Sequence, residues 1–433
     1  MISEQISEQS DAGRCMNRSM RRTKQLAFLF LAIAGLSTGC GGDKDDSGNT
    51  GEVDAGGLVN ELSPPKRSDI HGAMDPATGS FAVFGGDDGP IVNQTPMARY
   101  RDDTWLFTQG IGWEDVSSAG PSARGRQAVA YDSSSQRMLI FGGRFRPEGM
   151  GGNYTLFSDL WSFGFADKAW TKLSDGQGGP QARYFATSAF DNGSGTFYVY
   201  GGATSPQALS IRLAEDLWSF KDNTWTQVTT SGSAPSPARL FMAYTHDTKR
   251  NSLIAFGGQI GDFQTPSLND IYSLDLATGV WSALPATGMA PSGRFSSLMT
   301  YDAQGDRYIM MGGHADLGVT NDVWAYSPDA GSWEQLFVGD TFTGGALGCL
   351  GNPREIPKTY MDQDTSGPER RSGGFLGYSD NSVWLFGGES DCSDHLDDTW
   401  RLDLSDNSWN EELSATSGES CARQNSDCQC LCL

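Results

Sequence analysis

The chain has few basic residues. Its 31 lysines and arginines stand against 53 aspartates and glutamates, which gives a formal charge of −22 over 433 residues. A nucleic-acid-binding surface needs clustered positive charge to displace counterions from the phosphates, so the composition excludes nucleic acid as a partner. The acidity is typical of a solvated, soluble surface. A calcium-binding loop of the D-x-[DN]-x-[DN]-G type does not occur in the sequence.

Motifs of common catalytic sites are also missing. The chain has four histidines, His71, His246, His314 and His395, and their spacing does not indicate a metal site. The nucleophile elbow G-x-S-x-G, the zinc motif H-E-x-x-H and the phosphate-binding loop do not occur in the sequence. We therefore assign no catalytic residue and expect neither a metal nor a cofactor.

Long apolar runs are almost absent. The exception, Leu26–Leu36, follows three basic residues and is about half as long as a stable membrane-spanning helix. Positive charge followed by a short apolar run is the pattern of a secretory signal peptide. We assign residues 1–39 to such a signal, with translation starting at Met1 or at Met20.

The apolar run ends in the sequence STGC at residues 37–40, which resembles the lipobox of bacterial lipoproteins. The resemblance implies that Cys40 carries a lipid and becomes the first residue of the mature chain. Leu36 lies one residue further from the cysteine than in the usual motif, so the alternative is an ordinary signal peptide with a chance cysteine. Residues 40–57 contain almost no apolar side chains and cannot form a core, which predicts a flexible tether. Gly41 favours, by analogy, sorting to the outer membrane of the cell envelope.

One sequence unit recurs six times between residue 66 and residue 413. In each unit an arginine precedes a short apolar strand, a turn rich in Asp, Asn, Ser and Gly, and a second apolar strand that ends in Gly-Gly. Turns of this composition join antiparallel strands. The arginines are Arg67, Arg124, Arg183, Arg239, Arg294 and Arg371, and the glycine pairs begin at Gly85, Gly142, Gly201, Gly257, Gly312 and Gly387.

A second signature follows each glycine pair across a loop. It consists of an aspartate, an aliphatic or threonine residue and Trp or Tyr, and a further tryptophan comes shortly afterwards. The aspartates are Asp103, Asp159, Asp216, Asp270, Asp322 and Asp398, and the later tryptophans are Trp113, Trp170, Trp225, Trp281, Trp333 and Trp409. Each unit thus contains four strands, which we call a (after the arginine), b (ending in Gly-Gly), c (with the aspartate signature) and d (with the later tryptophan).

Four-stranded sheets with two apolar faces bury both faces when they stand side by side around an axis, and a closed ring leaves only short edges. Tryptophans at fixed positions fill the space between the outer strands. The pattern resembles the kelch-repeat family, which implies an all-β, six-bladed β-propeller over residues 58–413, as in the central domain of galactose oxidase. We expect each repeated arginine to tie one blade to the next and each repeated aspartate to cap the returning loop. Leu58–Leu62 is a candidate extra strand for the last blade.

The two faces of such a ring differ. Because strand direction alternates, the long b–c loops and d–a linkers share one face, the loop face, and the short a–b and c–d turns share the other, the turn face. Long loops on a rigid scaffold commonly carry binding sites. We therefore place the site on the loop face, with Arg99, Tyr100, Arg144, Phe145, Arg146, Tyr154, His314 and Glu389 as candidate binding residues. Arginine beside tyrosine and phenylalanine suits protein hot spots or sugar stacking; the alternative is that these side chains only pack loops together.

These observations favour a monomeric, lipid-anchored, non-enzymatic module that binds a protein or a polysaccharide at the cell envelope. A rival hypothesis is a periplasmic sugar-active kelch enzyme of the mutarotase type, for which Asp87, His314 and Glu389 are the obvious acid–base candidates. A third is a structural envelope protein that meets its partners through its edges.

Six cysteines follow Cys40 in the mature chain. Cys349, in the linker before the sixth unit, and Cys392, in the b–c loop of that unit, both belong to the loop face. We therefore expect a disulfide between them, since secreted proteins meet an oxidising compartment. Residues 414–433 form a tail with Cys421, Cys428, Cys430 and Cys432, whose spacing matches no common zinc site and whose pairing stays open.

Overall fold

The structure is a computed structural model that describes residues 62–414 except 90, 93–94, 97, 148–151, 208–209, 262–264, 317, 343–360, 363 and 391–394. The signal peptide, Cys40 and the tether lie outside the described residues. So do Cys349 and Cys392 of the expected disulfide and the four tail cysteines. Every regular element that the structure describes is a β-strand. None of the described residues forms a helix of the length and apolar character that a membrane crossing requires.

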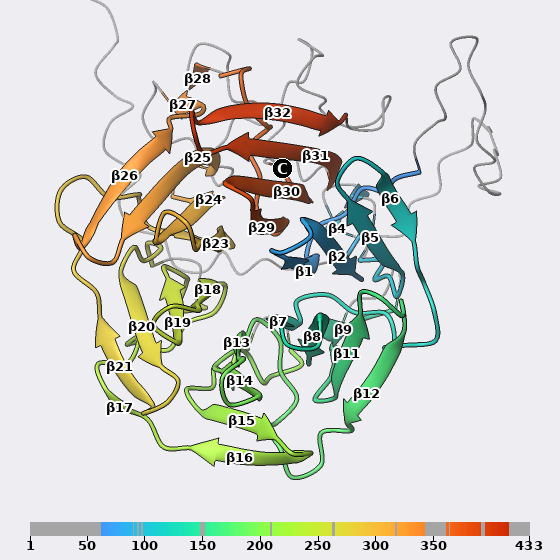
Figure 1. Ribbon diagram of the computed structural model, residues 1–433. Helices are drawn as coiled ribbons and strands as arrows, with labels where there is room; N and C mark the ends of the chain where they lie inside the picture. The colour runs from blue at the N-terminus through green and yellow to red at the C-terminus, as the bar shows by residue number, and fades with distance from the viewer. Residues whose placement is uncertain are drawn as a thin grey trace, which may run out of the picture. The chain divides into compact units, whose positions relative to one another are not determined.

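Six antiparallel sheets, each built from one sequence unit, form the blades (Figure 1). In every blade the four strands follow the order a, b, c and d predicted from the repeat. Blade 1 contains β1 (His71–Asp75), β2 (Ser80–Phe84), β5 (Thr104–Thr108) and β6 (Gly112–Asp115); blade 2 contains β7 (Ala128–Asp132), β8 (Arg137–Phe141), β11 (Leu160–Gly164) and β12 (Trp170–Ser174); blade 3 contains β13 (Thr187–Asp191), β14 (Thr196–Tyr200), β15 (Leu217–Lys221) and β16 (Thr224–Val228).

Blades 4 to 6 follow the same plan. Blade 4 contains β18 (Ala243–Asp247), β19 (Ser252–Phe256), β20 (Ile271–Asp275) and β21 (Val280–Ala283), with β17 (Ser231–Gly232) added at its outer edge; blade 5 contains β23 (Leu298–Asp302), β24 (Arg307–Ala315), β25 (Gly318–Ser327) and β26 (Ser332–Phe337), with β22 (Arg294–Phe295) paired to β24; blade 6 contains β29 (Phe375–Ser379), β30 (Ser382–Glu389), β31 (His395–Asp403) and β32 (Ser408–Leu413).

The hydrophobic core lies between the blades. Each of six clusters of buried apolar side chains draws its members from two neighbouring blades, and one of them joins blade 6 to blade 1. The second tryptophan of a blade reaches the blade before it: the Trp170 ring packs on Phe84 with centroids 5.0 Å apart, and its Nε1 donates to Thr104 Oγ1 at 2.9 Å. Closing the ring is therefore what buries these faces, as the sequence predicted.

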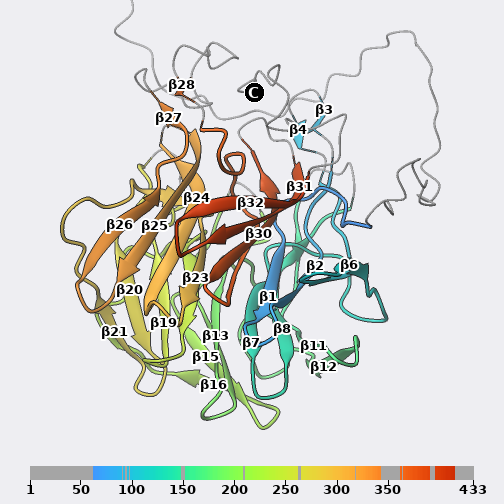
Figure 2. The same ribbon diagram turned by 45° about the horizontal axis from the view of Figure 1, so that its top comes forward.

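The ring closes without a shared strand in the described part of the chain. At the junctions of blades 1–2, 2–3, 4–5 and 5–6 the repeated arginine of one blade uses its main chain to contact the blade before it; for example, Arg124 N donates to Arg101 O, and Gly86 N donates to Arg124 O. The same pair of bonds joins blade 6 to blade 1, where Arg67 N donates to Leu396 O and Gly388 N donates to Arg67 O. Figure 1 shows β29 and β1 side by side at this junction, and Figure 2 shows β30 and β32 of blade 6 next to β1 and β2 of blade 1. Residue 62 lies in no strand, and residues 58–61 lie outside the described residues.

The side chain of the repeated arginine has a different role from the one we expected. It stays inside its own blade: in blade 6 the Arg371 guanidinium holds Asp398 through two bonds of 2.6 and 2.7 Å and also donates to Gly387 O. Trp400 Nε1 donates to the same carboxylate at 2.7 Å. The repeated arginine therefore does tie one blade to the next, but through its main chain and not through its guanidinium group. The guanidinium, carboxylate and indole connect strands a, b and c of one blade.

This Arg–Asp–aromatic lock recurs in all six blades, with Tyr272 replacing the tryptophan in blade 4. The six arginine side chains are almost fully buried. Burial alone would raise the pKa of the Asp322 carboxyl, but hydrogen bonds and charge from Arg294 outweigh it and hold that pKa below its usual value. The repeated aspartate is thus a buried counter-ion as well as a residue at the start of strand c.

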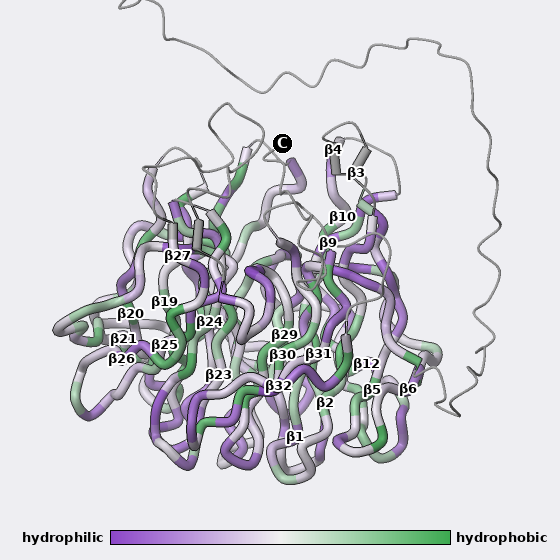
Figure 3. The backbone as a smooth tube through the Cα atoms, turned by 90° about the horizontal axis from the view of Figure 1, so that it is seen from above, coloured by the Kyte–Doolittle hydropathy of each residue, from purple (hydrophilic) through white to green (hydrophobic). Residues whose placement is uncertain are grey.

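Two faces of unequal character result. Figure 3 shows the ring from the side, with the two-stranded ribbons at one end and the short turns at the other. These ribbons on the loop face are β3 (Ile91–Val92) with β4 (Thr95–Pro96), β9 (Arg144–Phe145) with β10 (Thr155–Leu156), and β27 (Thr341–Phe342) with β28 (Met361–Asp362).

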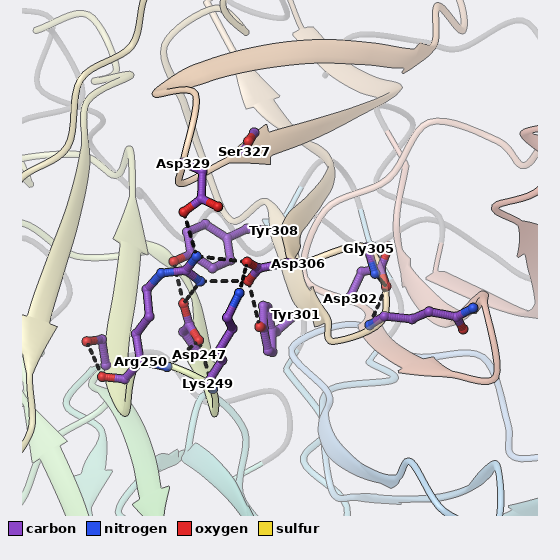
Figure 4. A network of polar contacts seen from close by, with 12 residues as sticks. Asp247, Lys249, Arg250, Tyr301, Asp302, Gly305, Asp306, Tyr308, Ser327 and Asp329 are labelled. Atoms are coloured by element: carbon purple, nitrogen blue, oxygen red, sulfur yellow. Dashed lines mark hydrogen bonds and ion pairs between the residues drawn. The ribbon is translucent and has the colours of Figure 1, made fainter.

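The turn face carries an ion-pair network between blades 4 and 5 (Figure 4). Arg250, in the a–b turn of blade 4, contacts Asp247 of its own blade and Asp306 and Asp329 of blade 5 at 2.7 to 3.0 Å. Tyr308 donates to Asp247 at 2.7 Å beneath it. All of these charges are paired with one another, so the network connects blades 4 and 5 and is not a candidate ligand site.

Candidate functional site

The inner strands of the six blades enclose a central channel. Its cavity has a volume of about 540 Å³ and is lined by the a strands and the residues that precede them. Ligand sites commonly have volumes of about 300–1,000 Å³ and mainly apolar walls with a few placed polar groups. The Tyr244 hydroxyl accepts a bond of 3.0 Å from Val129 N, so this side chain spans the cavity from blade 4 to blade 2. The part of the channel above Tyr244 opens at the loop face.

A ring of six equivalent residues surrounds the loop-face opening, which we call the mouth. Each lies two positions after the repeated arginine and has a positive φ between 53° and 64°; they are Asp69, Arg126, Phe185, Phe241, Ser296 and Gly373. Main-chain bonds link them around the axis; for example, Phe185 N donates to Arg126 O at 3.0 Å, and Ser296 N donates to Phe241 O at 2.9 Å. The backbone is thus the same in every blade, while the side chains are unrelated.

The left-handed backbone is costly for large side chains. Residues such as arginine and phenylalanine lose about 1–3 kcal/mol each in this region, and such strain is concentrated at binding and catalytic sites. Blade 6 has glycine there, which takes the conformation freely. The structure nevertheless places Arg126, Phe185 and Phe241 on this ring, which makes the mouth a candidate binding site.

A second ring of paired positions lies beside the first. The residue after each Gly-Gly pair forms a β-bridge with the residue after the repeated arginine, as in Gly125 with Arg144 and Ser372 with Glu389. The members after Gly-Gly are Asp87, Arg144, Ala203, Gln259, His314 and Glu389. The two rings together divide the mouth into an acidic sector on blades 6 and 1, a basic sector on blade 2, and an aromatic sector on blades 3 to 5.

Two arginines of blade 2 share one carboxylate in the basic sector. Arg126 forms an ion pair with Asp69, and Arg144 Nη2 lies 3.7 Å from the other oxygen of the same side chain. The Arg126 guanidinium covers Phe185, with 4.4 Å to the ring centroid, and the Arg144 guanidinium covers Tyr154 at 4.2 Å. Arg146 also lies over Tyr154, at 4.8 Å. Cation–π contacts thus hold all three guanidinium groups beside aromatic rings.

Aromatic rings continue from this cluster around the mouth. Successive centroids lie 6.4, 5.0, 3.8, 5.3 and 4.9 Å apart along Tyr154, Tyr184, Phe185, Phe241, Phe295 and His314. Of these, Tyr184 is buried and the others are half-buried. We call this series the aromatic arc. It joins four blades and presents ring faces and edges to solvent at one place.

Tyr100 packs underneath the basic sector. Its ring lies against Gly125, where even a Cβ atom would come within 3.0 Å of it. Burial raises the pKa of the Tyr100 hydroxyl, so this group stays protonated as a donor. Nearby, burial lowers the pKa of His71 to about 4, so the imidazole is neutral at pH 7.

The structure brings most of the predicted binding residues together. Tyr100, Arg144, Phe145, Arg146 and Tyr154 form one cluster, in which Phe145 lies 6.1 Å from the Tyr100 ring. His314 joins the aromatic arc by stacking on Phe295.

Two predicted residues lie outside this cluster, Arg99 on blade 1 and Glu389 at the blade-6 position of the second ring, and the acid–base candidates are spread over three blades. Arg99 pairs with Asp88 at 2.8 Å, and Glu389 lies opposite His395 in the blade-6 sheet. The Asp87 carboxylate accepts bonds from the main-chain N–H groups of Gly89 and Arg99, which gives it a loop-capping role. Within the described residues, no three His, Cys, Asp or Glu side chains meet in a metal-binding arrangement.

Sequence reasoning missed the residues that define the mouth. Asp69, Arg126, Phe185, Phe241 and Phe295 lie one or two positions after the repeated arginines, and no motif in the sequence singles them out. Aligning the six units at the arginine would have revealed them, because the next two residues read SD, GR, YF, LF, FS and SG. Such variation at one fixed backbone position indicates a surface that is not constrained by the fold.

Comparisons with known proteins agree with the ring. Residues 149–343 match the model of the Attractin/LZTR1 beta-propeller family. The chain is 24% identical over 337 residues to the leucine-zipper-like transcriptional regulator 1 homolog of Drosophila melanogaster, covering 75% of this chain and 30% of that protein. It is 27% identical over 229 residues to kelch domain-containing protein 10 of Rattus norvegicus, covering 50% of this chain and 52% of the relative. Kelch domain-containing protein 2 of Bos taurus is 24% identical over 298 residues.

The chain thus spans from about a third to about half of the first two relatives. The family match runs from blade 2 into blade 5, and the blades close into a ring of six. The chain is a six-bladed β-propeller that is similar to the kelch-type propellers.

Proposed function

We propose that this chain is a non-enzymatic protein-binding module that holds a segment of its partner against the mouth of the propeller. The observation that carries the proposal is the aromatic arc flanked by three arginines, within which Arg126, Phe185 and Phe241 adopt a backbone conformation that is strained for large side chains. Tyrosine and arginine are enriched among the residues that dominate binding energy in protein interfaces. Half-buried rings on a rigid ring of strands lose little entropy when a partner covers them.

The acid–base alternative has less support. Asp87 is engaged by its own loop, His314 stacks within the aromatic arc, and Glu389 lies on blade 6. A general acid and base must both reach one substrate atom, and these three groups lie on blades 1, 5 and 6. A binding role needs no such convergence.

The proposal includes the place where the module works. The STGC sequence at residues 37–40 and the tether of residues 40–57 favour attachment to the cell envelope through a lipid on Cys40, with the propeller free to turn on its tether. The fold also supports a monomer, since each apolar blade face is covered by the neighbouring blade.

A photo-crosslinking amino acid placed at Phe295, in the mouth, tests the protein-binding role in the native host. We expect one discrete protein adduct that disappears when Phe241→Ala is added, because that change removes a central ring of the aromatic arc. The same crosslinker at Gln304, an exposed turn-face residue, is the matched control and should give no such adduct.

A glycan array and a sugar-turnover assay on the same variants test the rivals. Glycan binding that depends on Phe241, without a protein adduct at Phe295, would replace the protein partner with a polysaccharide. Turnover lost in Glu389→Gln or His314→Ala would replace the module with an enzyme.

A further inference from the structure

The central channel has a second opening, on the turn face. Tyr244 crosses the channel with its hydroxyl bonded to Val129 N at 3.0 Å, and Ser188 Oγ donates to Val129 O at 2.8 Å. The cavity continues past this side chain to the residue that directly follows strand a in five blades: Pro76, Ser133, Asn192, Thr248 and Ala303. These residues belong to the a–b turns, and all but Asn192 are exposed. We call the part of the channel between Tyr244 and these turns the lower channel.

One layer of large side chains lines the lower channel. It consists of the fourth residue of each strand a: Met74, Tyr131, Phe190, His246, Tyr301 and Tyr378. Tyr244 is the second residue of its strand, so the layer lies on the same side of the strands and about 7 Å closer to the turn face. Five of the six side chains are aromatic. Because a single tyrosine side chain spans the channel at Tyr244, a guest on the axis lies beside rings from several blades.

The wall of the lower channel carries no positive charge. Among the described residues, no lysine or arginine lines it. Burial lowers the pKa of His246, so its imidazole is neutral at pH 7. Burial, and then the carboxylate of Asp306, raises the pKa of the Tyr301 hydroxyl, which donates to that carboxylate at 2.9 Å (Figure 4). A phenol that donates to a carboxylate is polarised by it, which makes the ring richer in electrons.

Carboxylates surround this layer. The next residue of strand a is an aspartate in five blades: Asp75, Asp132, Asp191, Asp247 and Asp302. Two of them form ion pairs, Asp247 with Arg250 and Asp302 with Arg307, and the other three accept hydrogen bonds from neutral groups of their own turns. From the last residue of strand a to the first of strand b, the six turns contain seven aspartates and four lysines or arginines. Negative charge is therefore in excess around the turn-face opening.

We propose that the lower channel binds a small quaternary ammonium compound, which enters from the turn face and lies among the aromatic side chains of the layer. Aromatic rings attract such cations, and the attraction is stronger where water is excluded. The surrounding aspartates add a long-range attraction that the cation receives without direct contact. A bare metal ion is less suited, because within the described residues no three His, Cys, Asp or Glu side chains meet in a metal-binding arrangement. This site lies at the other end of the channel from the mouth and does not depend on the proposed function.

Isothermal titration calorimetry with the full chain tests the charge of the ligand. Choline is the probe, and 3,3-dimethylbutan-1-ol is its uncharged counterpart of the same shape. We expect choline to bind and the alcohol to bind about tenfold more weakly or not at all, because only the cation gains from the rings and the carboxylates. Equal affinities for the two compounds, or a dissociation constant of choline above about 10 mM, would overturn the proposal.

Two phenylalanines of blade 3 test the place of binding. Phe190→Leu removes one ring of the layer and should weaken choline binding by about fivefold or more. Phe220→Leu is the matched control, because Phe220 is as buried as Phe190 (8% and 7% exposed) but does not line the cavity, and it should change the affinity by less than about twofold. Equal losses in the two variants would count against the lower channel. If Phe190→Leu does not fold, as judged by circular dichroism, Tyr131→Leu, a change of a half-buried layer residue, takes its place.

Further titrations distinguish the source of the cation and the end of the channel. A peptide with one trimethylated lysine, or vesicles of phosphatidylcholine, that displace choline at far lower concentration would overturn the assignment to a small compound. Phe241→Ala, which removes a ring of the mouth, should leave choline binding unchanged; a loss would place the cation at the mouth instead. The crosslinked adduct at Phe295 should persist in Phe190→Leu, so failure of this site and failure of the proposed function give different results.

Discussion

Replacing the repeated aspartate by asparagine, one blade at a time, measures the strength of the Arg–Asp–aromatic lock. The arginine is nearly fully buried in each blade, but the exposed fraction of the aspartate side chain ranges from 7% for Asp398 to 41% for Asp270. Asparagine keeps the shape but removes the charge, and it directs N–H groups at donors that the carboxylate had satisfied. The loss should therefore grow as the exposure of the aspartate falls.

Magnitudes follow from the surroundings of each pair. Removing one partner of a buried ion pair costs about 3–5 kcal/mol, which we expect for Asp398→Asn. Solvent screens the exposed pair, so Asp270→Asn should cost about 1 kcal/mol. Asp103, Asp159, Asp216 and Asp322 should fall between these limits.

Urea unfolding of the full chain, followed by circular dichroism and tryptophan fluorescence, gives the free energy of unfolding for each variant at unchanged slope. Asp167→Asn, whose side chain is 53% exposed in a turn, is the control and should stay within about 0.5 kcal/mol of wild type. If all six variants lose the same free energy of unfolding, or if Asp270→Asn loses more than Asp398→Asn, the reasoning is refuted. Burial of the aspartate would then not determine how much the ion pair contributes to stability.

Three further predictions concern other parts of the chain. Burial lowers the pKa of His71 from 6.5 to about 4, so below pH 6.5 this histidine binds a proton in the unfolded chain but not in the folded chain. The free energy of unfolding should therefore fall by up to about 3 kcal/mol between pH 6.5 and 4. Urea unfolding midpoints measured across this range should show that His71→Gln loses this part of the pH dependence. Arg250→Gln breaks the turn-face network, so it should cost about 1 kcal/mol at low salt and much less at 1 M salt; an equal shift of the melting temperature at both salt concentrations would count against an electrostatic staple. Cys40→Ser should abolish labelling of the chain with radioactive palmitate in a bacterial host, and continued labelling would rule out Cys40 as the lipid site.

The repeat made the architecture predictable. Glycine pairs, aspartates and tryptophans at fixed spacing fixed the number of blades and the order of strands, because each unit contributes the same buried positions. The role of the arginine side chain was not predictable in the same way. A guanidinium can reach forward or back by similar distances, and only the structure shows that Arg371 turns to Asp398 of its own blade while its main chain contacts blade 5.

The candidate site was predicted in part. Arg144, Arg146 and Tyr154 stood out because they lie in a long loop, and the structure places them together. Arg126, Phe185 and Phe241 come from three consecutive blades and meet only when those blades pack around the axis. Their convergence depends on the positive φ that follows each repeated arginine, and no local sequence signal reports that conformation for arginine or phenylalanine.

Closure without a shared strand has a mechanical consequence. Every other pair of neighbouring blades is joined by a peptide linker. Blades 6 and 1 are joined, within the described residues, by packing and by hydrogen bonds, such as Arg67 N to Leu396 O and Trp113 Nε1 to Thr399 Oγ1. Tension applied to the two ends of the ring would act on this seam first. The seam is therefore where the propeller should begin to open, and a new covalent bridge across it should slow unfolding more than the same bridge at any other junction.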